Sequence, residues 1–242
     1  MDLHLNLSCG LTGDMFIAGV LDAFPQFEQR VIAAIDALDG PYPVACSLVG
    51  HADDEVNGHR FEIEPFDKYF GVIPLAFPRE PATWEWVRKR LAGAHIGAAV
   101  RMHATKIFEL LVRAEAAAQR ISPERVVFEA GAWNSIAQVV GAAALIDALV
   151  TAQWSASALP AAGVTLTGAA IVDYLCPPRL RGRAQPKGRS LVRSGTGFGW
   201  VNSQNIHLRV LCFEADGGAR VQHETTPGSR RTAGGTDRQP SQ

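Results

Sequence analysis

The first forty residues change from strand-like to helix-like spacing of apolar positions. Leucines at positions 3, 5 and 7 alternate with polar residues and predict a strand. A loop with glycines at positions 10 and 13 follows this strand. Apolar residues at helical spacing then predict helices over 14–24 and 27–38, with Pro25 between them.

A hairpin is expected next. Apolar residues over 44–49 and 60–63 predict two strands, and Asn57-Gly58 lies at the turn end. Residues 1–65 are therefore expected to form a β-α-β-β sub-domain in which helices pack on a small sheet. Several prolines in the segment that follows indicate a connector.

The rest of the chain favours helices. Apolar positions from Val100 to Ala114 form one stripe and predict a long helix over 98–120. The further predicted elements are a helix that Asn134 caps, a strand over 156–160, a short helix from Thr167-Gly168 to about Leu175, and a strand over 206–213.

These elements predict an α+β or α/β fold with four parts. The parts are the β-α-β-β sub-domain (1–65), a connector and helix (66–97), a mainly helical α/β sub-domain (98–214) and a disordered tail (215–242). The tail is rich in Gly, Thr, Arg, Ser and Gln and has few apolar residues, which is typical of disorder.

The strand, loop and helix at the N-terminus form the first candidate site. This arrangement directs backbone N–H groups and a helix N-terminus toward one point, where an anion, or a metal held by Asp14, can bind. The alternative is that Asp14 only caps the helix and the glycines only turn the chain.

Other polar residues give weaker signals. Glu129 follows an apolar run, and such a carboxylate often lies at the mouth of a sheet, although a surface position is the alternative. The seven histidines form no local metal-binding pair, and His103 and His207 are expected to be partly exposed on a helix and a strand.

Composition excludes several classes of protein. The net charge of −1 argues against nucleic acid as a partner, and no apolar run is long enough to span a membrane. The N-terminus does not resemble a secretory signal. Four scattered cysteines suggest reduced thiols, and the chain is therefore expected in the cytoplasm.

One basic cluster stands out. Residues 177–193 carry six Lys or Arg and no acid, so phosphate could bind there, although a solvated loop is the favoured interpretation. The Gly-rich run 194–199 lacks the Lys-Ser/Thr ending of a P-loop and is a weak signal.

Three segments of the chain together resemble the nickel-insertion (LarC) family of nickel-pincer cofactor biosynthesis. The opening LNLSCGLTGDMFIAGVLDA resembles that family's LDCFSGISGDMFLGALLDL. Residues 106–149 resemble its IFRxLAEAEAxVHG and HFHEVGAVDSIVDIVGAA, and 166–170 resemble its TPTGAA. The strand over 206–210 is also similar, so the likeness covers most of residues 3–213 in order.

The departures from the family pattern remove expected metal ligands. Asn6, Asn134 and Gln138 stand where the family has Asp, and Val126 and Phe128 stand where it has His. The segment after the hairpin lacks the family's histidines, and the segment between Pro160 and Thr167 is short. A C-terminal nucleotide-binding domain is also expected to be absent, with the tail in its place.

The resemblance implies a site and its ligands. Asp14 and Glu129 would be the catalytic and metal-binding residues. The residues that would bind the nucleotide are Gly10, Thr12, Gly13, Ser135, Thr167 and Gly168. It further implies nickel, with Mn or Mg and a nucleotide (CTP in the family), a pyridinium mononucleotide substrate, and either a separate nucleotide-binding chain or a homo-oligomer as partner.

Three hypotheses follow. The chain is a nickel-insertion protein of the LarC type, a lyase with a weakened or lost metal site, or it is an inert relative that serves as a binding or assembly module. The third is an unrelated small-molecule enzyme that uses the loop from Gly10 to Asp14. The first two place a shared cleft between that loop and the turn from Glu129 to Ser135.

Overall fold

A computed structural model describes most of the chain. The described residues are 1–40, 43–53, 56–67, 71–72, 82–128, 132–176, 182 and 188–214. Glu129, most of the basic cluster and the predicted disordered tail lie outside these residues, so the expectations about them stay predictions.

A mixed sheet of seven strands organises the described part of the chain. The strands are β1 (Asp2–Asn6), β2 (Val44–Ala52), β3 (Asn57–Asp67), β4 (Gly71–Val72), β7 (Gln153–Ala156), β8 (Leu191–Val201) and β9 (Gln204–Phe213). Their order is β2-β3-β8-β9-β1-β7, with β4 added to β3. Two further strands, β5 (Ala82–Thr83) and β6 (Val127–Phe128), pair separately.

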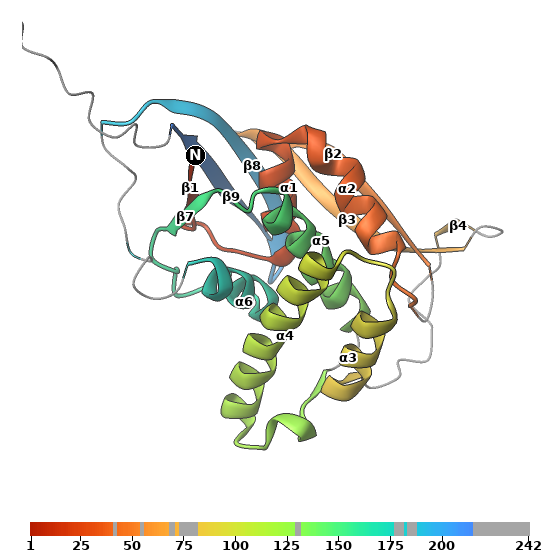
Figure 1. Ribbon diagram of the computed structural model, residues 1–242. Coiled ribbons are helices and arrows are strands. Elements are labelled where there is room, and N and C mark those ends of the chain that lie inside the picture. Colours follow the sequence, from red (N-terminus) through yellow and green to blue (C-terminus); the bar gives the residue numbers. More distant parts are fainter. Residues whose placement is uncertain are drawn as a thin grey trace, which may run out of the picture.

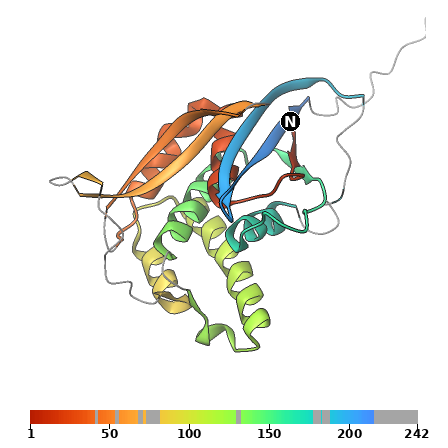
Figure 2. The ribbon, with the colours of Figure 1, turned by 180° about the vertical axis from the view of Figure 1, so that it is seen from behind.

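The helices lie mainly on one side of this sheet (Figure 1). They are α1 (Gly13–Ala23), α2 (Glu28–Asp36), α3 (Trp84–Gly93), α4 (Ala98–Gln119), α5 (Ala132–Ala148) and α6 (Leu166–Leu175), with short 3-10 turns at Pro25–Phe27 and Pro123–Arg125. Helix α1 packs between the sheet and α5, and nearly all of its residues are buried. Seen from behind, β2, β3, β8 and β9 lie in front of the helices (Figure 2).

The α+β class is confirmed, but the sheet is larger than the first 65 residues suggested. Strand β1 pairs with β9 and β7, and the β2–β3 hairpin joins it only through β8 and β9. Strands from both ends of the chain therefore form one sheet. Leu3 and Leu5 share one face of β1 and His4 lies on the other, and all three are buried, so β1 is an interior strand with both faces covered.

Three predicted details were wrong. Asn134 does not cap α5 but lies inside it, because Trp133 and Ile136 are both buried at helical spacing. Strand β7 comes before the expected range, because residues 153–156 are the ones in register with β1. The run 194–199 belongs to a strand, β8, which the sequence analysis missed.

Other expectations are confirmed. All four cysteines are free thiols. His103 on α4 and His207 on β9 are both partly exposed. Within the described ranges, no helix is both long and apolar enough to cross a bilayer.

Candidate functional site

The candidate site is a cavity of about 310 Å³ beside the junction of β3 and β8. These two parallel strands pair at a single position, His59 with Gly197. The residues that follow this pair in each strand, 60–64 and 198–200, line the cavity together with Asp14, Asn134 and Gln138. The carboxyl ends of parallel strands are a common place for ligands to bind.

Helix α1 brings Asp14 to this cavity because glycines in β8 let the helix approach closely. A Cβ atom on Gly197 would overlap the carbonyl oxygen of Met15 and lie 2.5 Å from the backbone nitrogen of Gly19. A Cβ atom on Gly199 would lie 2.9 Å from the Thr12 hydroxyl. The glycines at alternate positions of β8 therefore let α1 pack closely against the strand, and the run is not a phosphate-binding loop.

The start of α1 is fixed by a side-chain cap. The Thr12 hydroxyl accepts a hydrogen bond from the Met15 N–H at 3.2 Å, as expected of an N-cap residue. Asp14 follows in the first turn of the helix, where the helix dipole favours a negative charge.

Burial nevertheless raises the pKa of Asp14 above its ordinary value. The Thr12 hydroxyl, the N–H groups of Asp14 and Met15, and the positive charge of Arg60 all lower this pKa, and together they do not offset the loss of hydration. A cation in the cavity would relieve this cost, because it would lie next to a carboxylate that has lost water.

Arg60 is held in place by three neighbours on other strands. Its Nη2 atom donates to Asn205 Oδ1 at 2.8 Å and lies 3.2 Å from His51 Nε2. Its guanidinium carbon lies 4.7 Å from the ring centroid of Trp200. The cavity therefore has a fixed positive group beside the carboxylate of Asp14.

Three of the predicted binding residues adjoin this cavity through Gln138. A Cβ atom on Gly13 would lie 2.6 Å from Gln138 Oε1 and 3.1 Å from Thr167 Cγ2. The Thr167 hydroxyl donates to Ser135 Oγ at 3.5 Å. Gly13, Ser135 and Thr167 therefore come together, although binding by them stays a prediction.

The other two predicted glycines have packing roles. Gly10 has a φ of 132°, which a side chain rarely adopts, and it faces the carbonyl of Gly163. A Cβ atom on Gly168 would lie 2.5 Å from the carbonyl oxygen of Leu11. Both contacts hold the loop between β1 and α1 against the start of α6.

The side-chain atoms of this cavity that could coordinate a metal ion are oxygen atoms. Asp14, Glu62 and Glu64 contribute carboxylates, and Asn134 and Gln138 contribute amides. Among the described residues, no group of three or more His, Cys, Asp or Glu side chains is arranged to hold a metal ion. The carboxylates therefore share a cavity without forming a complete metal site.

The sequence analysis missed Arg60, Glu62, Glu64 and Trp200. The first three alternate along β3 and so share one face of that strand, which is the one signal that could have grouped them. Trp200 carried no signal, because only the junction of β3 with β8 brings it near Arg60.

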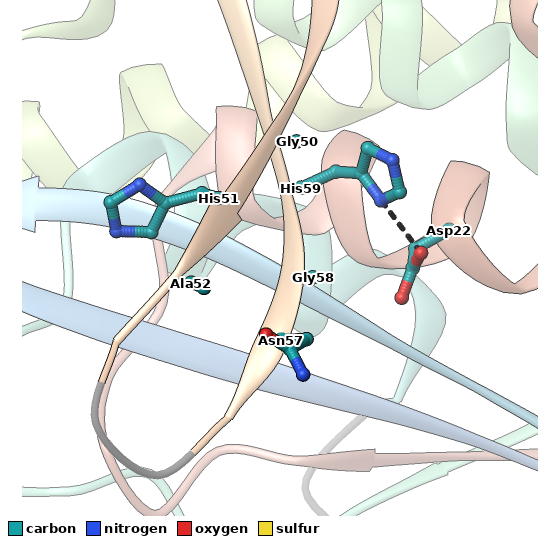
Figure 3. A pocket seen from close by; sticks show the side chains of 7 residues that line it. All are labelled: Asp22, Gly50, His51, Ala52, Asn57, Gly58 and His59. Atoms are coloured by element: carbon teal, nitrogen blue, oxygen red, sulfur yellow. Dashed lines mark hydrogen bonds and ion pairs between the residues drawn. The ribbon is translucent and has the colours of Figure 1, made fainter.

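A second cavity, of about 430 Å³, lies at the far end of α1 (Figure 3). His59 points toward Asp22, and the Asp22 Oδ1 atom lies 2.6 Å from His59 Nδ1. Asp22 Oδ2 accepts a hydrogen bond from the Thr196 N–H at 2.7 Å. His51 also lines this cavity but points away from Asp22, so the two histidines do not converge.

The strand, loop and helix present the carboxylate of Asp14 to the first cavity, and a carboxylate in such a place can attract a cation. Comparison with known proteins assigns the family: the model of the nickel insertion protein family matches residues 3–170 of the 242. The chain belongs to the nickel insertion protein family, as the resemblance indicated.

A curated relative comes from a Nocardioides species and is named pyridinium-3,5-bisthiocarboxylic acid mononucleotide nickel insertion protein. It is 31% identical over 141 residues, which are 58% of this chain and 33% of the relative. The chain therefore matches about a third of that relative's length. No solved structure gives a significant match.

Proposed function

We propose that this chain is a nickel insertion protein of nickel-pincer cofactor biosynthesis with a weakened metal site. Its substrate would be the pyridinium-3,5-bisthiocarboxylic acid mononucleotide named for the relative, and nickel would be the cargo. The observation that carries the proposal is the cavity that Asp14 shares with Asn134 and Gln138. The resemblance expects carboxylates at both amide positions.

The exchange of carboxylate for amide supports a weak site. An amide oxygen can still coordinate a cation, but it lacks the charge that attracts one. Oxygen donors also suit Mg²⁺ and Mn²⁺ better than nickel, which favours nitrogen and sulfur. The protein would therefore hold nickel loosely through Asp14, with Glu129 as the second proposed ligand, and the sulfur atoms of the substrate would take the ion over.

The charged groups of the cavity suit an anionic nucleotide. The guanidinium of Arg60 is fixed near Asp14 and offers a positive charge to a phosphate. Ser135 would donate a further hydrogen bond. Gly10, Thr12, Gly13, Thr167 and Gly168 would shape the cleft, because the two threonines are buried and the glycines are closely packed.

The inert scaffold remains the second candidate function. It is favoured by the lack, in the described part of the chain, of three or more grouped metal-ligand side chains. In that case the chain would bind the nucleotide or a partner without inserting nickel. A separate nucleotide-binding chain that uses CTP with Mn or Mg, a homo-oligomer and a cytoplasmic location remain part of either proposal.

Calorimetric titration of the full chain with Ni²⁺ and with Mn²⁺ tests the first proposal. We expect uptake at roughly micromolar to sub-millimolar metal, which is lost in Asp14→Ala and in Glu129→Ala. Asp39→Ala is the matched control, because the Asp39 side chain is 91% exposed and lines neither of the two cavities. If no heat is released at millimolar metal, nickel binding is contradicted and the inert scaffold is the remaining candidate. If Asp14→Ala binds metal as well as the wild-type chain does, Asp14 is not a metal ligand.

A further inference from the structure

A cysteine and a histidine from opposite ends of the chain meet beside the candidate site. The Cys9 Sγ atom lies 3.6 Å from the Nε2 atom of His207. Cys9 lies in the loop between β1 and α1, and His207 lies on β9. Of the four cysteines, Cys9 is exposed, whereas Cys46 is half-buried and the other two are buried.

The spacing of these two atoms fits a shared metal ion. Metal–sulfur and metal–nitrogen bonds of about 2.3 and 2.0 Å at a tetrahedral angle place the two donor atoms about 3.5 Å apart. The observed separation of 3.6 Å is close to this value. Without a metal the two atoms are at hydrogen-bonding distance, and the tautomer of the imidazole decides which of them donates.

The donor chemistry differs from that of the Asp14 cavity. Thiolate and imidazole favour zinc, nickel and copper, whereas carboxylate and amide oxygens favour magnesium and manganese. The two places are also neighbours. The His207 ring lies 5.8 Å from the ring of Phe198, and Phe198 lines the cavity that contains Asp14.

We propose that Cys9 and His207 together bind a divalent transition-metal ion of the nickel and zinc class. Binding forms one metal–sulfur and one metal–nitrogen bond and releases the thiol proton to solvent. Two protein ligands leave the other coordination positions to water or to an incoming sulfur atom, so the ion can be passed on. The assignment of nickel as the physiological ion rests on the proposed function.

Titration of the full reduced chain with Ni²⁺ alone, followed by the ultraviolet absorption of a nickel–thiolate bond, tests this site. The wild-type chain should develop the band at one equivalent, and Cys9→Ser should not. His207→Gln should weaken binding at least about tenfold, because the loss even of a group that orients a ligand costs that much. Cys46→Ser is the matched control and should keep the band.

The outcomes separate this site from the proposed function. Absence of the band in the wild-type chain, or its persistence in Cys9→Ser, overturns the Cys9–His207 site. Asp39→Ala should leave the band unchanged, since the exposed Asp39 carboxylate lines neither cavity. If the band forms and the chain does not insert nickel into the mononucleotide, the proposed function fails while the Cys9–His207 site stands.

Discussion

The two acidic residues of α1 face different cavities and use their oxygen atoms differently. Asp22, in the last turn, binds the Thr196 N–H with one oxygen and the His59 ring with the other. Within the described residues, the hydrogen bonds to Asp14 come from the start of its own helix. Asp22 thus connects α1 to β3 and β8, whereas Asp14 makes no such connection.

This difference indicates that the Asp22 carboxylate stabilises the fold, whereas the Asp14 carboxylate is free to contact a ligand in its cavity. Both oxygens of Asp22 have partners from distant parts of the chain, so its charge is already used to stabilise the fold. Burial raises the pKa of Asp14, and the charge of Arg60 offsets only part of that effect. A partly buried carboxylate with a perturbed pKa beside a cavity is typical of functional sites.

The largest expected effect comes from separating α1 from the sheet. In Gly197→Ala, the added methyl group would overlap backbone atoms of Met15 and Gly19, which cannot rotate away. We expect a loss of about 3 kcal/mol in the free energy of unfolding, measured by urea denaturation. Both ends of α1 would shift, so the metal binding that we propose at Asp14 should weaken as well.

Gly50→Ala on β2 is the control for this change. No heavy atom lies within 4 Å of the position that its Cβ would take. Its stability should change by less than about 0.5 kcal/mol. Equal stability of the Gly197→Ala and Gly50→Ala variants would mean that α1 does not rest on the glycines of β8.

The next largest effect should come from Asp22. Asp22→Ala leaves the Thr196 N–H and the His59 ring without their partner. The expected loss is about 2 kcal/mol, because hydrogen bonds to charged groups contribute that much. Chemical denaturation measures it, with the exposed Asp39→Ala expected within about 0.5 kcal/mol of wild type. A change as small as that of the control would show that Asp22 does not connect the three elements.

The local elements around these acids could be predicted from the sequence. Apolar residues at helical spacing identified α1 and α4, and the pattern of strand, loop and helix pointed to Asp14, which the structure places beside a cavity. Strand β8 was missed because its glycines at positions 195, 197 and 199 remove the alternation of apolar side chains on one face. Their role becomes visible only when α1 is packed against them.

The residues that line the Asp14 cavity could not be predicted either, and the reason differs from the one for β8. Arg60 and Trp200 are 140 positions apart in the sequence and meet because β3 and β8 pair at one point. No local pattern encodes that pairing. The same holds for Asp22, whose partners lie on two strands from opposite ends of the chain, and for Cys9 with His207.

Protonation of His4 should make the free energy of unfolding depend on pH. His4 is buried, its Nδ1 atom lies 3.0 Å from Ser155 Oγ, and burial lowers its pKa below the ordinary 6.5. The unfolded chain therefore takes up the proton first, and stability should fall as the pH drops below about 6.5.

The slope of this pH dependence can be measured by denaturation at several pH values. The contribution of His4 to this slope should be at most about 1.4 kcal/mol per pH unit, so the slope should be smaller in His4→Gln than in the wild-type chain. Identical slopes in the two proteins would show that another group causes the loss of stability.

The smallest expected effect is a gain in stability from Asp14→Asn. A raised pKa means that the ionised carboxylate is less favourable in the folded chain than in the unfolded one. The wild-type chain carries this cost at neutral pH and is relieved of it as the pH falls through the folded pKa toward the ordinary value of 3.8.

The amide of Asp14→Asn removes this cost, so the variant should be slightly more stable than wild type at pH 7, by less than the loss in Asp22→Ala. The difference should fade as the pH falls through the folded pKa of Asp14 toward 3.8. Addition of Mn²⁺ should reverse the order, because the ion stabilises only the chain that keeps the carboxylate. A variant that is less stable than wild type at pH 7, and equally stabilised by Mn²⁺, would make Asp14 a structural residue like Asp22.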